Sequence, residues 1–114
     1  MAEPSPREPG AAGTLRLALA ALAWLACAAP AAAATVTIEI DGMKFTPAAA
    51  TVRSGDRVVW VNRDLVPHTA TSGKAFDSGV IAPGESWSTM AGAPGRHDYL
   101  CSLHPTMKAS LLVQ

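Results

Sequence analysis

The chain has 114 residues with nine basic and nine acidic side chains, so its formal net charge is zero. This length fits one domain at most. The charge also balances over residues 35–114, which carry seven residues of each sign, so nothing suggests the basic surface by which proteins bind nucleic acid. A domain of this size buries a modest fraction of its surface, so a bound metal would add useful stability.

The first 34 residues lack the pattern of a globular fold. Residues 17–34 form an apolar run that is rich in Ala and Leu, interrupted by Pro30, and ends in small residues at Ala34. Such a run predicts a signal peptide over residues 1–34, with export to the periplasm. Two alternatives stay open: retention of the segment as a membrane anchor, or lipidation at Cys27.

Removal of this segment leaves Cys101 as the one cysteine of residues 35–114. A single cysteine cannot form an internal disulfide. A thiol in an oxidising compartment is expected to pair with another chain or to be held by some other group. Coordination to a metal ion would hold it.

Short runs typical of β-strands follow residue 35, separated by Gly and Pro turns. Val36, Ile38 and Ile40 alternate with polar residues, which predicts a strand with one buried face. Residues 57–62 are apolar on both faces in their middle, which predicts a central strand. The spacing of these runs predicts an all-β fold, a small antiparallel sandwich or barrel. Further strands are expected at residues 50–53, 79–81, 86–90, 95–101 and 108–113, and residues 71–77 are expected to be the least structured.

The segment from Cys101 to Met107 carries a thiol, an imidazole and a thioether at three-residue spacing, with His104 between them. A second imidazole, His68, lies 33 residues upstream of the cysteine. Two imidazoles, a thiolate and a weak axial thioether are the ligands of a blue copper electron-transfer site. Pro105 lies within the segment and would stiffen a loop that has to hold these ligands.

Each of these residues also has an ordinary structural interpretation. A lone buried cysteine or methionine is usually part of a core, and a lone histidine is more often structural than a ligand. The combination of Cys101, His104 and Met107 favours the metal site. His97 is interpreted as structural, because four residues of extended strand put it about 13 Å from Cys101.

The pattern resembles the cupredoxin family and, within it, is most similar to the amicyanins. The resemblance spans most of residues 36–113 and is carried by 43–45, 52–64, 67–68, 95–101 and the Cys-x₂-His-x₂-Met segment. It implies a Greek-key β-sandwich with one copper ion at one end. His68, Cys101 and His104 would be the equatorial ligands and Met107 the axial one.

The resemblance also implies that Asn62 and Pro67 hold the loop of the first histidine ligand. Two residues depart from the family pattern. Thr69 stands where the family commonly has Asn, so the backbone N–H toward the thiolate is kept while the side-chain anchor changes. His97 stands where the family often has an aromatic residue.

These features predict a monomeric carrier of single electrons and not an enzyme. Its partners would be redox proteins, a dehydrogenase or a c-type cytochrome, which dock transiently on an apolar patch around His104. The patch is expected to comprise Leu65, Val66, Pro67, Leu103, Pro105 and Thr106. Copper storage or delivery stays open as the alternative. A Cys–His nucleophilic enzyme would need a third orienting group, for which the sequence offers no candidate, and Met is a poor ligand for structural zinc.

Overall fold

The computed structural model describes residues 2–5 and 32–114. The predicted signal peptide, residues 1–34, therefore lies almost entirely outside the described residues, and so does Cys27. Within the described ranges, no helix has the length and apolar character needed to span a membrane. Residues Ala33–Gln114 form a compact unit of their own.

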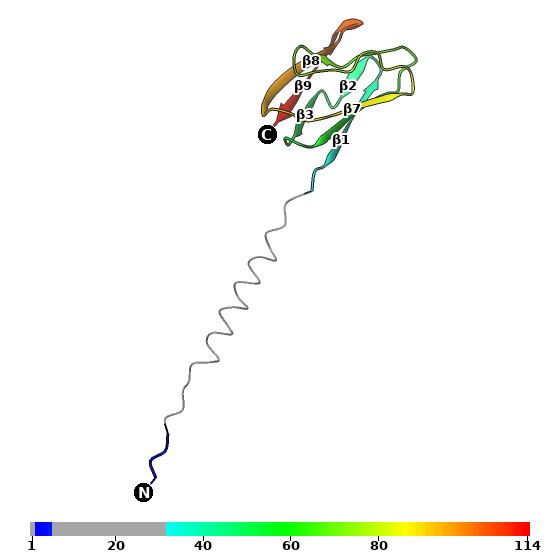
Figure 1. Ribbon diagram of the computed structural model, residues 1–114. Helices are drawn as coiled ribbons and strands as arrows, with labels where there is room; N and C mark the ends of the chain where they lie inside the picture. The colour runs from blue at the N-terminus through cyan, green and yellow to red at the C-terminus, as the bar shows by residue number, and fades with distance from the viewer. Residues whose placement is uncertain (1, 6–31) are drawn as a thin grey trace. The chain divides into compact units, whose positions relative to one another are not determined.

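This unit is built from β-strands in two sheets, coloured from cyan to red in Figure 1. The first sheet has the strand order β2-β1-β4-β7, comprising Lys44–Thr46, Thr35–Asp41, Arg57–Asn62 and Ser86–Met90. The second has the order β3-β9-β8-β5-β6, comprising Ala49–Val52, His104–Val113, Gly95–Cys101, Thr71–Ser72 and Phe76–Asp77. The expected all-β sandwich is thereby confirmed.

Both sheets are mixed, which corrects the expectation of purely antiparallel pairing. Strand β1 runs parallel to β4, with Ile38 opposite Trp60, and β3 runs parallel to β9. A parallel pair needs a crossover connection, and the chain makes one for β1 and β4 by passing through β2 and β3. Alternation of apolar residues shows which face of a strand is buried, but it carries no information about the direction of the neighbouring strand.

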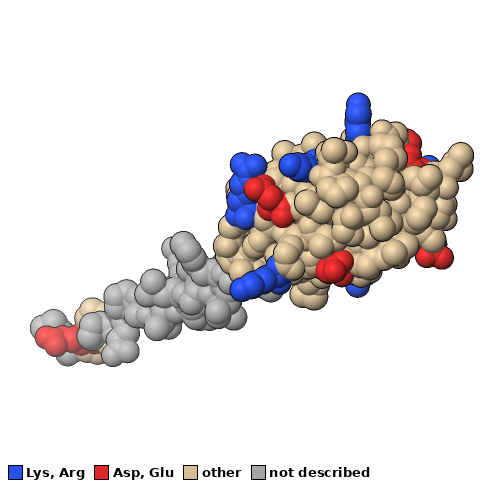
Figure 2. All heavy atoms as spheres, turned by 90° about the horizontal axis from the view of Figure 1, so that it is seen from above, with Lys and Arg blue, Asp and Glu red and all other residues tan. Residues whose placement is uncertain are grey.

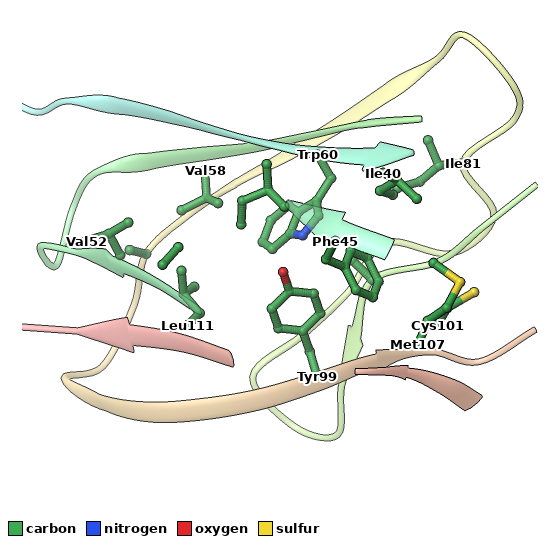
Figure 3. Close-up of a cluster of buried hydrophobic side chains, with 14 of the residues drawn as sticks. Ile40, Phe45, Val52, Val58, Trp60, Ile81, Tyr99, Cys101, Met107 and Leu111 are labelled. Atoms are coloured by element: carbon green, nitrogen blue, oxygen red, sulfur yellow. The ribbon is translucent and has the colours of Figure 1, made fainter. Parts of the chain in front are cut away.

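The core lies between the sheets and is rich in aromatic rings (Figure 3). Ile38 and Ile40 are fully buried, as the alternation in β1 predicts. Trp60, in the interior strand β4, is also fully buried, and its ring centroid lies 5.7 Å from that of Tyr99. Burial raises the pKa of Tyr99 to about 12. Because Tyr99 is two residues before Cys101, this packing fixes the end of β8 where the candidate ligands begin.

Four segments differ from the strands expected from the sequence. Strand β9 begins at His104 and not at residue 108, after a two-residue turn at Ser102 and Leu103, and residues 105–107 form an irregularity without partners in β8. Residues 71–77, expected to be the least structured, contain the short hairpin β5–β6. Residues 79–81 contribute only an isolated bridge between Ile81 and His68. Strand β2 was not expected.

Candidate metal centre

The candidate ligands come from two places that the fold brings together. Cys101 is the last residue of β8, His104 is the first of β9, and the two form a register pair across the turn. Met107 follows in β9. His68 lies after β4 and is held by hydrogen bonds with Ile81, since each residue's N–H donates to the other's carbonyl at 3.1 and 2.7 Å.

The three nitrogen and sulfur donors converge on one point. The Sγ atom of Cys101 lies 3.6 Å from Nδ1 of His68 and 3.7 Å from Nδ1 of His104. One ligand atom from each of these residues lies within 4.8 Å of the others. Met107 is buried, and Figure 3 shows its side chain beside that of Cys101 at one end of the core. The candidate ligands expected from the sequence therefore lie close together in the fold.

The surroundings of Cys101 favour a thiolate. Burial opposes ionisation, but a hydrogen bond from the backbone N–H of Thr69, at 3.3 Å, and contacts with His68 and His104 outweigh it. Together they lower the pKa of the Cys101 thiol to about 6. The thiolate is the form of cysteine that binds metals. The expected N–H donor at Thr69 is thus present in the structure.

Asp64 fixes the orientation of His68. Its Oδ2 atom lies 2.8 Å from His68 Nε2. Its carboxylate also accepts the N–H groups of Gly42, at 2.7 Å, and Met43, at 3.0 Å. Burial opposes ionisation of Asp64, but these bonds outweigh it and hold the pKa of its carboxyl below the usual value. Because a carboxylate only accepts, Nε2 of His68 carries a proton, which leaves Nδ1 as the nitrogen that would bind a metal.

The turn between β1 and β2 supplies the two backbone donors to Asp64. Gly42 and Met43 have φ values of +61° and +60°, the left-handed region that a type I′ hairpin turn requires at both central positions. Their N–H groups consequently point the same way, toward the Asp64 carboxylate. Asp64 was not expected to take part in the site, and its closeness in sequence to His68 is the signal that could have identified it.

Asn62 holds the loop that carries His68. It is fully buried, and its amide nitrogen donates to the carbonyls of Val66 and Ile81, at 2.9 Å each. Its amide oxygen accepts the N–H of Asp64 at 2.9 Å. One side chain thereby ties both ends of the loop to the strand β4.

One side of the site reaches the surface. His104 is half-buried, whereas His68 and Cys101 are fully buried. The six expected patch residues are all exposed, including Leu65 at 94%. Met43, on the turn that binds Asp64, is a further exposed apolar side chain that the sequence analysis did not include.

The third histidine lies apart from the converging donors, and the charges on the surface are mixed. On the face shown in Figure 2, basic and acidic side chains are interspersed, and Arg63 pairs with Glu39 at 2.9 Å. Nε2 of His97 lies 2.9 Å from the carbonyl oxygen of Ala93. His97 is not part of the group of converging donors.

The donor set fits copper by its chemistry. Thiolate and thioether are soft donors that suit Cu(I), and imidazole suits both oxidation states of copper. The buried Asp64–His68 hydrogen bond adds the carboxylate support that metal-bound histidines usually have.

Comparison with known proteins gives a consistent result. A family model for the cupredoxin-like domain matches residues 15–113. Amicyanin-alpha from Methylorubrum extorquens is 33% identical over 88 residues, which cover 72% of this chain and 74% of that protein. Plastocyanin from Prochlorothrix hollandica is 34% identical over 94 residues, which cover 70% of this chain and 72% of that protein. The resemblance to cupredoxins, and among them to amicyanin, is confirmed.

A solved structure shows the same domain in a larger protein. The Cu-containing nitrite reductase from Thermus scotoductus SA-01 matches with a TM-score of 0.66 at 26% identity, over 70% of this chain and 22% of the reductase. A match to so small a part of the reductase concerns the fold and not the enzyme's activity. With the family model covering most of its length, this chain belongs to the cupredoxin family.

Proposed function

We propose that this chain is a periplasmic blue copper protein that carries single electrons between redox partner proteins. His68, Cys101, His104 and Met107 would hold one copper ion. The observation that carries the proposal is the convergence of two imidazole nitrogens on one thiolate sulfur, at 3.6 and 3.7 Å. Bound copper would supply a one-electron couple between Cu(II) and Cu(I).

The protein holds each donor in place independently of the metal. Cys101 and His104 are fixed by strand pairing between β8 and β9, and His68 is fixed by its bonds to Ile81 and Asp64. Because rigid strands and hydrogen bonds fix the donors, a change of oxidation state would move them little. Small rearrangement is what rapid electron transfer requires.

Access to the site is restricted to the His104 side. His104 is half-buried, and its neighbours along the chain, Leu103 and Pro105, are exposed, Leu103 at 48%. A small apolar surface of this kind suits the weak, brief docking of redox partners. A dehydrogenase as donor and a c-type cytochrome as acceptor are the partner classes we propose.

The same burial argues against copper delivery, the alternative function. Transfer of a metal ion to an acceptor requires that incoming ligands reach the ion. Cys101 and His68 are fully buried and Met107 is 5% exposed, so at least three of the four donors are inaccessible to such ligands. Burial of the Cys101 sulfur likewise argues against a nucleophilic enzyme, because a substrate could not reach the sulfur.

Visible absorption and EPR spectra of the Cu(II)-loaded protein test the proposal, with the Cys101→Ser variant as control. The expected result is an intense blue absorption with narrow copper hyperfine splitting, lost in the variant. A pale, ordinary Cu(II) spectrum of the wild-type protein would contradict it. Rapid extraction of Cu(I) by a chelator, together with an irreversible redox couple, would favour delivery instead.

We also propose that the protein is exported to the periplasm. Residues 1–34 would be removed as a signal peptide, leaving residues 35–114 as the functional domain, a monomer. The mass of the protein recovered from the periplasm tests this directly. A mass that includes residues 1–34 would indicate a retained anchor, and added lipid mass at Cys27 would indicate a lipoprotein.

A further inference from the structure

Three hydroxyl groups form a continuous hydrogen-bonded chain beside Cys101. Oγ1 of Thr69 lies 2.9 Å from Oγ of Ser102 and 3.0 Å from Oγ1 of Thr71. Thr71 in turn donates to Oδ1 of Asp77 at 3.2 Å. The backbone N–H of Ser102 also donates to Thr69 Oγ1, at 2.7 Å. This chain of bonds links the residue after Cys101 to the far strand of the β5–β6 hairpin.

Counting protons fixes the direction of every bond in this chain. A carboxylate only accepts, so the single hydroxyl proton of Thr71 is used on Asp77. The Thr71 oxygen must therefore accept the hydroxyl proton of Thr69. With its own proton used, Thr69 Oγ1 can only accept from Ser102, from both its hydroxyl and its N–H. The bonds run in one direction, from Ser102 to Asp77.

Thr69 consequently holds the thiolate segment at two points. Its N–H donates to the sulfur of Cys101 at 3.3 Å, and its hydroxyl oxygen accepts the N–H of the next residue, Ser102. Thr69 is 3% exposed, so water cannot easily replace either bond. The second contact depends on the hydroxyl keeping its lone pairs toward Ser102.

We propose that Thr71 and Asp77 are positioning residues for the copper-binding thiolate. Thr71 accepts the hydroxyl proton of Thr69, and Asp77 accepts that of Thr71. The oxygen of Thr69 then stays turned toward Ser102 and its N–H stays directed at the sulfur. This inference rests on the proposed function, because it assigns a role in a copper site. A hydrogen bond to a ligand sulfur tunes the reduction potential of a copper site. The hydrogen-bonded chain from Ser102 through Thr69 and Thr71 to Asp77, called the relay below, would therefore influence that potential.

The hairpin is held firmly enough for this role. Thr71 pairs with Asp77 within the hairpin and with Leu100 of β8. Ser72 donates to the carbonyl of Asp98 at 2.7 Å. The carboxylate of Asp77 is itself fixed by the N–H of Gly79 at 3.0 Å.

Amide hydrogen exchange in the metal-free protein, followed residue by residue by NMR, tests the relay without any copper signal. In Thr71→Val, exchange of the Thr69 and Ser102 amides should accelerate on the order of tenfold, the factor that corresponds to one typical hydrogen bond. Thr71→Ser, which keeps the hydroxyl, should restore protection. Thr89→Val is the matched control, since Thr89 is equally half-buried but lies in the other sheet.

Asp77→Ala is a second variant, at an exposed position, and should accelerate the same two amides. The proposal would be overturned if the Thr69 and Ser102 amides of both Thr71→Val and Asp77→Ala exchanged at rates within about twofold of those in Thr89→Val. Uniform acceleration of amide exchange across the domain would also overturn it. In the copper-loaded protein, the reduction potential should shift in Thr71→Val and return in Thr71→Ser. A wild-type protein without the blue absorption, but with the two amides responding as expected, would refute the proposed function and leave the relay intact.

Discussion

Replacement of Asp64 by Asn tests how the ligand His68 is held. The carboxylate accepts three N–H groups: Gly42 bonds to Oδ1, and both Met43 and His68 bond to Oδ2. Asn has the same shape, but one oxygen becomes an NH₂ group, which can only donate. Whichever way the amide is turned, its NH₂ group faces at least one N–H donor.

The size of the effect follows from these contacts. A donor left without an acceptor costs about 1–3 kcal/mol when it is buried, as His68 is, but Gly42 and Met43 are exposed and water can partly replace their bonds. We therefore expect Asp64→Asn to lower the free energy of unfolding by about 1 kcal/mol, the low end of this range. For a domain of this size, that loss lowers the melting temperature by roughly 4–8 °C. Copper affinity should fall by about 10- to 100-fold, because the tautomer of His68 is no longer fixed.

Thermal unfolding of the metal-free protein, followed by circular dichroism, measures the stability change, and competition with a chelator measures copper affinity. Asp41→Asn is the matched control. It makes the same charge change at an exposed residue of β1 that, among the described residues, has no side-chain hydrogen bond or ion pair. The comparison therefore separates the hydrogen bonds of Asp64 from the general effect of losing one negative charge.

The pH dependence gives a second check. Since the pKa of Asp64 is lowered by folding, its contribution is complete above the ordinary carboxyl pKa of about 3.9 and is lost as the pH falls through the lowered value. The difference between wild type and Asp64→Asn should shrink in acid. Melting temperatures of Asp64→Asn and Asp41→Asn that agree within about 2 °C at neutral pH would refute the reasoning.

Three further predictions concern the surface, the thiolate and the core. Leu103→Glu should slow electron transfer to a redox partner without altering the copper spectrum. Leu112→Glu, which changes a similarly exposed leucine near the far end of β9, should leave the transfer rate unchanged. Equal transfer rates in the two variants would count against the apolar patch as a docking surface. Because the folded-state pKa of Cys101 is about 6 and the unfolded value is about 8.5, the metal-free protein should gain stability as the pH rises between these values. Urea unfolding should show that this gain is absent in Cys101→Ser. Ile38→Ala, which empties a fully buried position, should cost about 2–5 kcal/mol in the same urea assay, and a loss below about 1 kcal/mol would mean that this part of the core repacks.

Local sequence was sufficient to predict the longer strands and the proximity of Cys101 and His104. The alternation of Val36, Ile38 and Ile40 depends only on neighbouring residues, and it correctly predicts the buried face of β1. The spacing of Cys101 and His104 reflects a turn between paired strands, which also depends on residues close in sequence. For this reason the donors could be selected without a structure.

Contacts between distant segments could not be predicted in the same way. The bonds from Gly42 and Met43 to Asp64 join residues 22 and 21 positions apart, and nothing in the local pattern of either segment indicates the other. The Thr69–Ser102 contacts span 33 positions. Pro105 suggested a stiff loop, and the structure assigns this residue to the strand β9, although residues 105–107 have no partner in β8.

The two-residue turn at Ser102 and Leu103 has a consequence for the order in which the site is assembled. Cys101 and His104 are three positions apart, whereas His68 is 33 positions from Cys101. Closing the longer loop costs about 2 kcal/mol more in chain entropy. We therefore expect the β8–β9 hairpin to bring Cys101, His104 and Met107 together before His68 completes the site.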